Sequence, residues 1–330
     1  MNILTAHLLN NVIAVFMLAP LVILYWRGGF MILQIYNTFH TYKYLAAFLE
    51  IAAGIAGGLM FSYTQVWMGK TSNRIRSPVA QLIIRRWYSY FFAWCVVCEW
   101  KGVWRLWDVV DAISGWETAL YSLLVGLVPL LLTRCFRNTL APPLATVSDL
   151  TETFFLIPTR FRTKRTSRIA HFLDNIFSMG IVIPLITSTW RGVWYLLDWL
   201  IVFPADVVAP ERQLFWSYMI STLSGFAIAV IAVLLQKPSS VISAYLEQQG
   251  RWLSKIVFED ILMAVATFAS IDLWRGVWGL YDEYFFPWDI VTSAWLSHIF
   301  GFFGLALMFH SNSAVMKGFQ YDGEHSDGGK

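Results

Sequence analysis

The chain has 330 residues, of which 57% are hydrophobic and only 14% are charged. A soluble domain carries about 25% charged residues, so this composition favours a membrane protein. The net charge of +3 is too small and its carriers too scattered to indicate nucleic-acid binding. Three cysteines exclude a disulfide framework.

Eight apolar segments are expected to form membrane-spanning helices, although several are shorter than the roughly 20 residues that cross a bilayer. In chain order they cover Leu8–Tyr25, Tyr44–Met68, Trp87–Trp107, Ala119–Leu132, Ile176–Thr189, Leu214–Leu235, Ile256–Ile271 and Ser293–Phe309. The sequence thus predicts an all-α polytopic membrane protein. We expect one membrane half at 1–133, a basic loop at 134–170, a second half at 171–312 and a disordered tail at 313–330.

A short motif, Trp-basic-Gly-Val-Trp, recurs after every second predicted helix. Full copies begin at Trp100, Trp190 and Trp274, and each is followed by an Asp eight residues after the first Trp. A weaker copy begins at Trp26 and has Gln34 at the acidic position. The residues of interest are Trp26, Arg27, Trp100, Lys101, Trp104, Asp108, Trp190, Arg191, Trp194, Asp198, Trp274, Arg275, Trp278 and Asp282. The pattern predicts four repeats of two helices, in which the first helix runs into the motif and the second follows it.

Glycine has a place in both helices of each predicted repeat. The second helices carry Gly54, Gly126, Gly225 and Gly301, which would let neighbouring helices approach closely in lipid. The motif glycine suits either the end of a helix or another close approach. With Trp on both sides of it, the motif is typical of the aromatic belt at a membrane interface, and the residues after it would form a short interfacial or re-entrant segment.

The motif charges have three interpretations. Arginine binds carboxylates through two hydrogen bonds, so pairs between neighbouring repeats, or across a break at the glycine, would lock the repeats together. Alternatively, the charges border an ion or substrate pathway, or they recognise a protein partner. Glu50, inside the second predicted span, and Asp272, at the end of the seventh, are further candidates for a role in conduction or coupling.

Basic residues predict the orientation. The loops opposite the motifs hold most of the Lys and Arg residues, so that side and both termini are expected in the cytoplasm. A basic cluster in the long loop could bind anionic lipid or only enforce topology; it comprises Arg160, Arg162, Lys164, Arg165 and Arg168.

Signatures of catalysis are absent from the sequence. It has no His-Glu-x-x-His, no phosphate-binding loop and no Gly-x-Ser-x-Gly. Cys95 and Cys98 lie one helical turn apart without further metal-ligating neighbours, so we interpret them as core residues. We expect no enzyme, no cofactor and no metal site.

The span layout and the segments Trp100–Asp108, Trp190–Asp198 and Trp274–Asp282 resemble the fuseless family of animal multi-pass membrane proteins. This resemblance implies a plasma-membrane protein of neurons that organises presynaptic machinery, including calcium-channel function, through partner contacts. A channel or transporter, with a pseudo-symmetric pathway at the motif charges, is the alternative.

Overall fold

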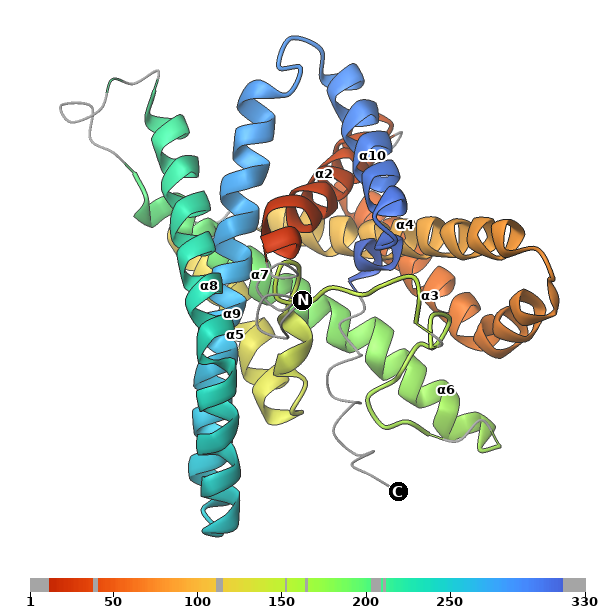
Figure 1. The fold of residues 1–330 in the computed structure, drawn as a ribbon. Coiled ribbons are helices and arrows are strands. Elements are labelled where there is room, and N and C mark those ends of the chain that lie inside the picture. Colours follow the sequence, from red (N-terminus) through yellow and green to blue (C-terminus); the bar gives the residue numbers. More distant parts are fainter. Residues whose placement is uncertain are drawn as a thin grey trace.

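The computed structural model describes residues 12–37, 41–110, 115–151, 153–163, 166–202, 209 and 212–316. These residues are helical apart from turns and one long connection, as the all-α prediction requires (Figure 1). The helices are α2 (Ala19–Ile35), α3 (Lys43–Arg74), α4 (Pro78–Val110), α5 (Gly115–Leu132), α6 (Arg168–Phe177), α7 (Ile183–Leu200), α8 (Gln213–Gln248), α9 (Trp252–Tyr284) and α10 (Ile290–Leu307). Turns of π-helix extend α2 at Ala14–Leu18 (η1) and join α6 to α7 at Ser178–Val182 (η4).

Five continuous helical segments are long and apolar enough to cross a membrane. They are Ala14–Ile35, Lys43–Arg74, Arg168–Leu200, Gln213–Gln248 and Ile290–Leu307. The segment Trp116–Leu132 is apolar but shorter. Helices α4 and α9 are long but carry the charged motifs, which lower their hydropathy. The described parts of the eight predicted segments therefore lie almost entirely on helices, and five helical segments meet the length and hydropathy expected of a span.

The helices pack as four antiparallel pairs, and the pairing differs from the one expected from chain order. Each motif helix packs on the glycine-bearing helix that precedes it, which gives the pairs α3 with α4, α5 with α7, and α8 with α9. The first motif helix, α2, packs instead on the last helix, α10 (Figure 1). The bundle is closed by this contact between the first and the last of these helices.

Glycine explains why these helices pair in this way. A Cβ at Gly276 would lie 2.4 Å from the backbone nitrogen of Thr222, and one at Gly225 would lie 2.4 Å from that of Leu273. The same reciprocal contact joins Gly28 with α10 and Gly301 with α2, and it recurs in the other two pairs. Backbones can approach this closely only where neither helix has a side chain. The motif glycine therefore serves a close approach rather than the end of a helix.

The long connection after α5 is largely internal. It begins with η3 (Phe136–Thr139), and its described residues form no α-helix before Arg168. Phe154 and Ile157 are buried, and Phe154 packs on Tyr88 of α4. Within the basic cluster, Arg160 donates to the carbonyl of Thr133, while Arg162 and Arg168 are exposed. Lys164 and Arg165 lie outside the described residues.

The segment after α10 corrects the predicted boundary of the tail. Ser311–Val315 form a 3₁₀ turn, η6, whose residues are all buried. Asp149 holds this turn, because its carboxylate accepts hydrogen bonds from the backbone nitrogens of Ser311 and Asn312 at 3.0 and 2.9 Å and from the Ser311 hydroxyl at 2.7 Å. Residues 313–315 therefore belong to the core, and the predicted disorder of residues 317–330 falls outside the described part of the chain.

Candidate functional site: a ring of motifs around a central axis

The four motifs lie inside continuous helices, namely α2, α4, α7 and α9. The expectation of a helix end or a re-entrant segment at the motif is wrong, since helical hydrogen bonding continues through each glycine. Arg27 precedes the end of α2 by eight residues, and Arg191 precedes the end of α7 by nine. At 1.5 Å per residue the basic side chains arise about 12–14 Å inside the helix ends.

The first aromatic residues of the motifs meet in a closed ring, which we call the inner ring. It consists of Trp26, Trp100, Trp190 and Trp274. Successive ring centroids are 5.1–5.8 Å apart with interplanar angles of 74–82°, so each indole meets the next edge to face. This geometry is favourable for aromatic pairs. All four rings are almost completely buried.

A second ring lies one helical turn closer to the C-terminal ends of these helices. This outer ring consists of Phe30, Trp104, Trp194 and Trp278. Its centroids are 5.5–6.3 Å apart, again edge to face. Two closed rings of four make the arrangement pseudo-fourfold about one axis. Phe30 completes the outer ring, so the weaker first copy of the motif is structurally equivalent to the others.

Backbone carbonyls close the axis on the other side of the inner ring. The indole nitrogens of Trp190 and Trp274 donate to the carbonyls of Thr139 and Pro142, at 2.9 and 2.7 Å. That of Trp26 donates to the carbonyl of Ala314 at 2.9 Å. We call these two segments, Thr139–Val147 and Ser311–Met316, the plug.

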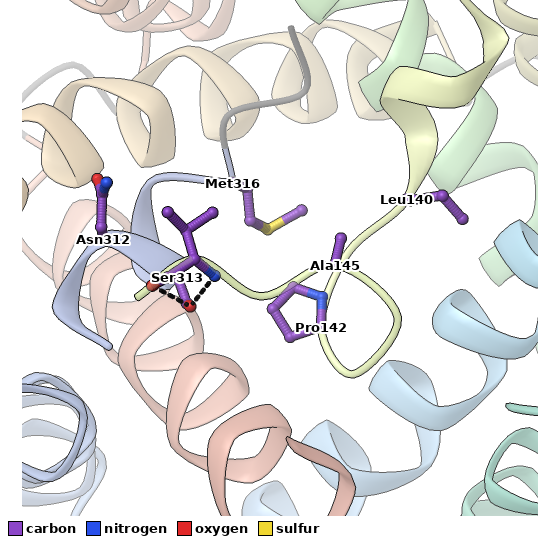
Figure 2. Close-up of a pocket in the computed structure, with 7 residues that line it drawn as sticks. Leu140, Pro142, Ala145, Asn312, Ser313 and Met316 are labelled. Atoms are coloured by element: carbon purple, nitrogen blue, oxygen red, sulfur yellow. Dashed lines mark hydrogen bonds between the residues drawn. The ribbon is translucent and has the colours of Figure 1, made fainter. Parts of the chain in front are cut away.

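The two segments of the plug bind each other. The hydroxyl of Ser313 accepts from the backbone nitrogen of Val147 at 2.9 Å and donates to its carbonyl at 3.2 Å. Figure 2 shows these two bonds, with Met316 pointing toward Ala145 and Pro142. The space left between the segments is only about 10 Å³, which is at the lower limit for a single water molecule.

The motif charges form ion pairs between neighbouring motifs. Arg27 binds Asp282 at 2.6 Å, Arg191 binds Asp108 at 3.2 Å, and Arg275 binds Asp198 at 2.6 Å. In each pair the arginine comes from one motif and the aspartate from the motif before it around the ring. The guanidinium groups are 0–3% exposed, whereas the carboxylates are 41–46% exposed. The pairing runs between motifs and not across a break within one.

Serines of the partner helices complete the arginine sites. Arg275 donates to Ser221 and Ser217 of α8, at 2.6 and 2.8 Å. Arg27 donates in the same way to Ser297 and Ser293 of α10, at 2.7 and 3.1 Å. We did not predict these serines, although a signal was present: in both helices they precede the packing glycine by four and eight residues.

The fourth corner of the ring departs from this scheme. There the basic residue is Lys101, and the position of the missing aspartate holds Gln34. The ammonium of Lys101 lies 5.4 Å from the centroid of Phe30. Lys101 forms no ion pair with any carboxylate of the described residues.

A cavity of about 440 Å³ lies on the axis, between the aromatic rings and the acidic residues. We call it the axial cavity. Its lining includes all eight aromatic side chains of the two rings together with Gln34, Lys101, Asp108, Asp198 and Asp282. It therefore offers an aromatic wall and charged groups to the side at which the motif helices end. The inner ring and the plug close it on the opposite side.

Glu50 and Asp272 lie away from the axial cavity. Glu50 binds Arg105 through two hydrogen bonds of 2.9 Å, which join α3 to α4. Asp272 is buried between α9 and α8, where Ser224 donates to it at 2.5 Å. Neither residue lines the central axis, so both contribute to pair packing.

One of three comparisons with known proteins found a match. A model of the Fuseless family matches residues 5–315. The search of curated proteins found no match, and the search of solved structures found none either.

Proposed function

Because the chain belongs to the Fuseless family, we propose that it is a non-enzymatic multi-pass membrane protein that regulates synaptic machinery, including calcium channels, through contacts with partner proteins. The observation that carries the proposal is the closed axis. The inner ring, the plug and the Arg–Asp pairs join all four helix pairs into one packed body. Such a body suits a rigid partner surface better than an open conduit.

We place eight spans in the bilayer, including α4 and α9. Each has 33 residues and reaches about 50 Å, which exceeds the roughly 30 Å hydrocarbon core. Their charged residues need not face lipid, since Glu99, Asp272 and Arg275 are 1–2% exposed within the bundle. Shielded in this way, a helix of modest hydropathy can still span.

Cysteine accessibility tests this topology. Val109→Cys and Ser77→Cys place thiols near opposite ends of α4. We propose that both termini and the basic loops are cytoplasmic, in the plasma membrane. An impermeant maleimide should then label position 109 in intact cells and position 77 only after permeabilisation. Labelling of both from outside would contradict a spanning α4.

Recordings test the partner role. We expect no new current in cells that express the chain alone. When it is co-expressed with a voltage-gated calcium channel, the density or voltage dependence of the calcium current should change. Trp199→Phe serves as a control variant that should act as the wild type does. Trp199 is exposed near the end of α7, so its replacement leaves the rings intact. An unchanged calcium current with normal surface expression would contradict the proposal.

A channel or transporter is the second candidate, because the axial cavity lies on the pseudo-symmetry axis and is lined by charged groups. In that case the inner ring would be its closed gate. Trp190→Ala should then open a leak current whose selectivity depends on Asp108 and Asp198. A Trp190→Ala protein that reaches the surface and conducts nothing would favour the partner role.

We also propose anionic lipid as a ligand of the basic cluster. Arg162 and Arg168 are exposed near the start of α6, where each such residue can contribute about 1 kcal/mol at a charged surface. Vesicle-reconstituted protein should show phosphatidylserine enrichment around it that falls in Arg162→Gln/Arg168→Gln. Equal phosphatidylserine enrichment around the wild type and the variant would mean that the basic cluster only fixes the membrane topology.

A further inference from the structure

The charge balance of the ring indicates which kind of ligand the axial cavity accepts. Three corners hold an arginine and an aspartate and are neutral as pairs. The fourth corner holds Lys101 opposite a neutral glutamine. The complete ring therefore has four cations and three anions, and its excess positive charge lies at Lys101.

A side pocket strengthens the positive character of this corner. It measures about 220 Å³ and shares Gln34, Lys101 and Asp108 with the axial cavity. Lys43 and Arg105 line it as well. Arg105 is neutralised by Glu50 and Asp108 is bound by Arg191, so Lys101 and Lys43 remain as the unbalanced charges.

An unbalanced cation inside a membrane protein is costly unless an anion or water compensates it. Each of the three aspartates of the cavity wall is already bound by an arginine, of which Arg275 also lines the cavity, so a cationic ligand would have to compete with these arginines. An anionic ligand would instead restore neutrality at the one corner that lacks a carboxylate. The charge distribution therefore favours an anion over an amine.

The cavity wall determines the rest of the ligand. A volume of about 440 Å³ falls within the usual range for small-molecule sites, which are mostly apolar with a few polar groups that fix orientation. Eight aromatic rings supply the apolar wall. Lys101, half-buried at its edge, supplies the polar group.

We propose that the axial cavity binds a small organic carboxylate, with its anionic group at Lys101 and its apolar body against the aromatic rings. Occupancy of this site does not depend on the partner role proposed above, because it requires only the folded ring.

Binding can be measured on the full chain in lipid nanodiscs, with benzoate as the probe. Benzamide and benzylammonium serve as neutral and cationic probes of the same size. Tryptophan fluorescence reports on the cavity, and calorimetry provides an independent measurement. We expect saturable benzoate binding at millimolar concentrations or below, with benzamide and benzylammonium weaker by at least about tenfold, as for loss of a charge-assisted hydrogen bond.

Two variants test the role of the fourth corner, and thermal unfolding checks that each is folded. Lys101→Gln should weaken benzoate binding by roughly 10- to 100-fold. Gln34→Asp keeps the lysine but supplies the missing carboxylate, so it should abolish benzoate binding without loss of fold. Lys237→Gln, an exposed position on α8, should bind as the wild type does.

Three results would overturn the proposal. One is the absence of a saturable benzoate signal at millimolar concentrations. Another is preferential binding of benzylammonium, which would show that the site favours cations. The third is benzoate affinity that Gln34→Asp and Lys101→Gln leave unchanged, which would place the anion elsewhere.

Discussion

Arg27 Nε lies 2.6 Å from Asp282 Oδ1, and this ion pair joins the first and last motifs of the chain across 255 residues. Together with the packing of α2 on α10, it closes the ring of helix pairs. Closure of this kind makes α2 and α10 mutually dependent, since neither helix has another partner of comparable contact among the described helices.

Asp282→Asn should destabilise the protein by about 1–3 kcal/mol. Loss of one partner of a buried pair costs more than this, but Asp282 is half-exposed and water can partly replace it. Thermal unfolding in detergent measures the effect, and Glu283→Gln, an exposed neighbour, is the control. Equal unfolding temperatures for the two variants would show that the closing pair is dispensable.

Gly276→Ala should destabilise the pair of α8 and α9 by about 1–3 kcal/mol, the usual cost of overpacking. Its Cβ would lie 2.4 Å from a backbone nitrogen, which can yield only if the helices separate. Gly69→Ala in α3 is the matched control, because its Cβ meets nothing closer than 4.0 Å. The unfolding temperature and the surface expression should fall for Gly276→Ala alone. A Gly276→Ala protein as stable as Gly69→Ala would refute the close-contact account.

Trp190→Phe tests the contact between the inner ring and the plug. The variant keeps an aromatic ring but leaves the buried carbonyl of Thr139 without its indole donor, which should cost about 1–3 kcal/mol. Trp199→Phe on the same helix removes an exposed indole and should be almost neutral. Denaturation of the two purified variants provides the comparison. A neutral Trp190→Phe would mean that water satisfies the carbonyl equally well.

Asp149→Ala should release η6 from the core. Three hydrogen bonds to its carboxylate hold Ser311 and Asn312, and each bond to a charged acceptor contributes about 1.5–3 kcal/mol. Hydrogen exchange of residues 311–315 should accelerate by at least about tenfold. Ser148→Ala, in the same loop, should leave this exchange unchanged. Unaltered protection in Asp149→Ala would assign the anchoring to the Ser313–Val147 bonds instead.

The helical class, the approximate positions of the helices and the repetition of the motif could be predicted from the amino-acid sequence alone. Apolar runs of near-spanning length force backbone hydrogen bonds to close within each helix, so these features are local. The Trp, basic and Asp positions were also evident from their spacing, as was the resemblance to the Fuseless family that the family model confirms.

Three features emerged only from the folded chain: the pairing of the helices, the position of the motif glycines inside helices, and the burial of Ser311–Val315. The sequence alone cannot distinguish a glycine that ends a helix from one that lets two helices pack closely. The difference depends on whether the backbone of another segment lies against that glycine. The lack of a carboxylate opposite Lys101 could not be recognised from the sequence for the same reason. Gln34 and Lys101 are distant in sequence, and only closure of the ring brings them to one cavity, where the charge of one is not balanced by the other.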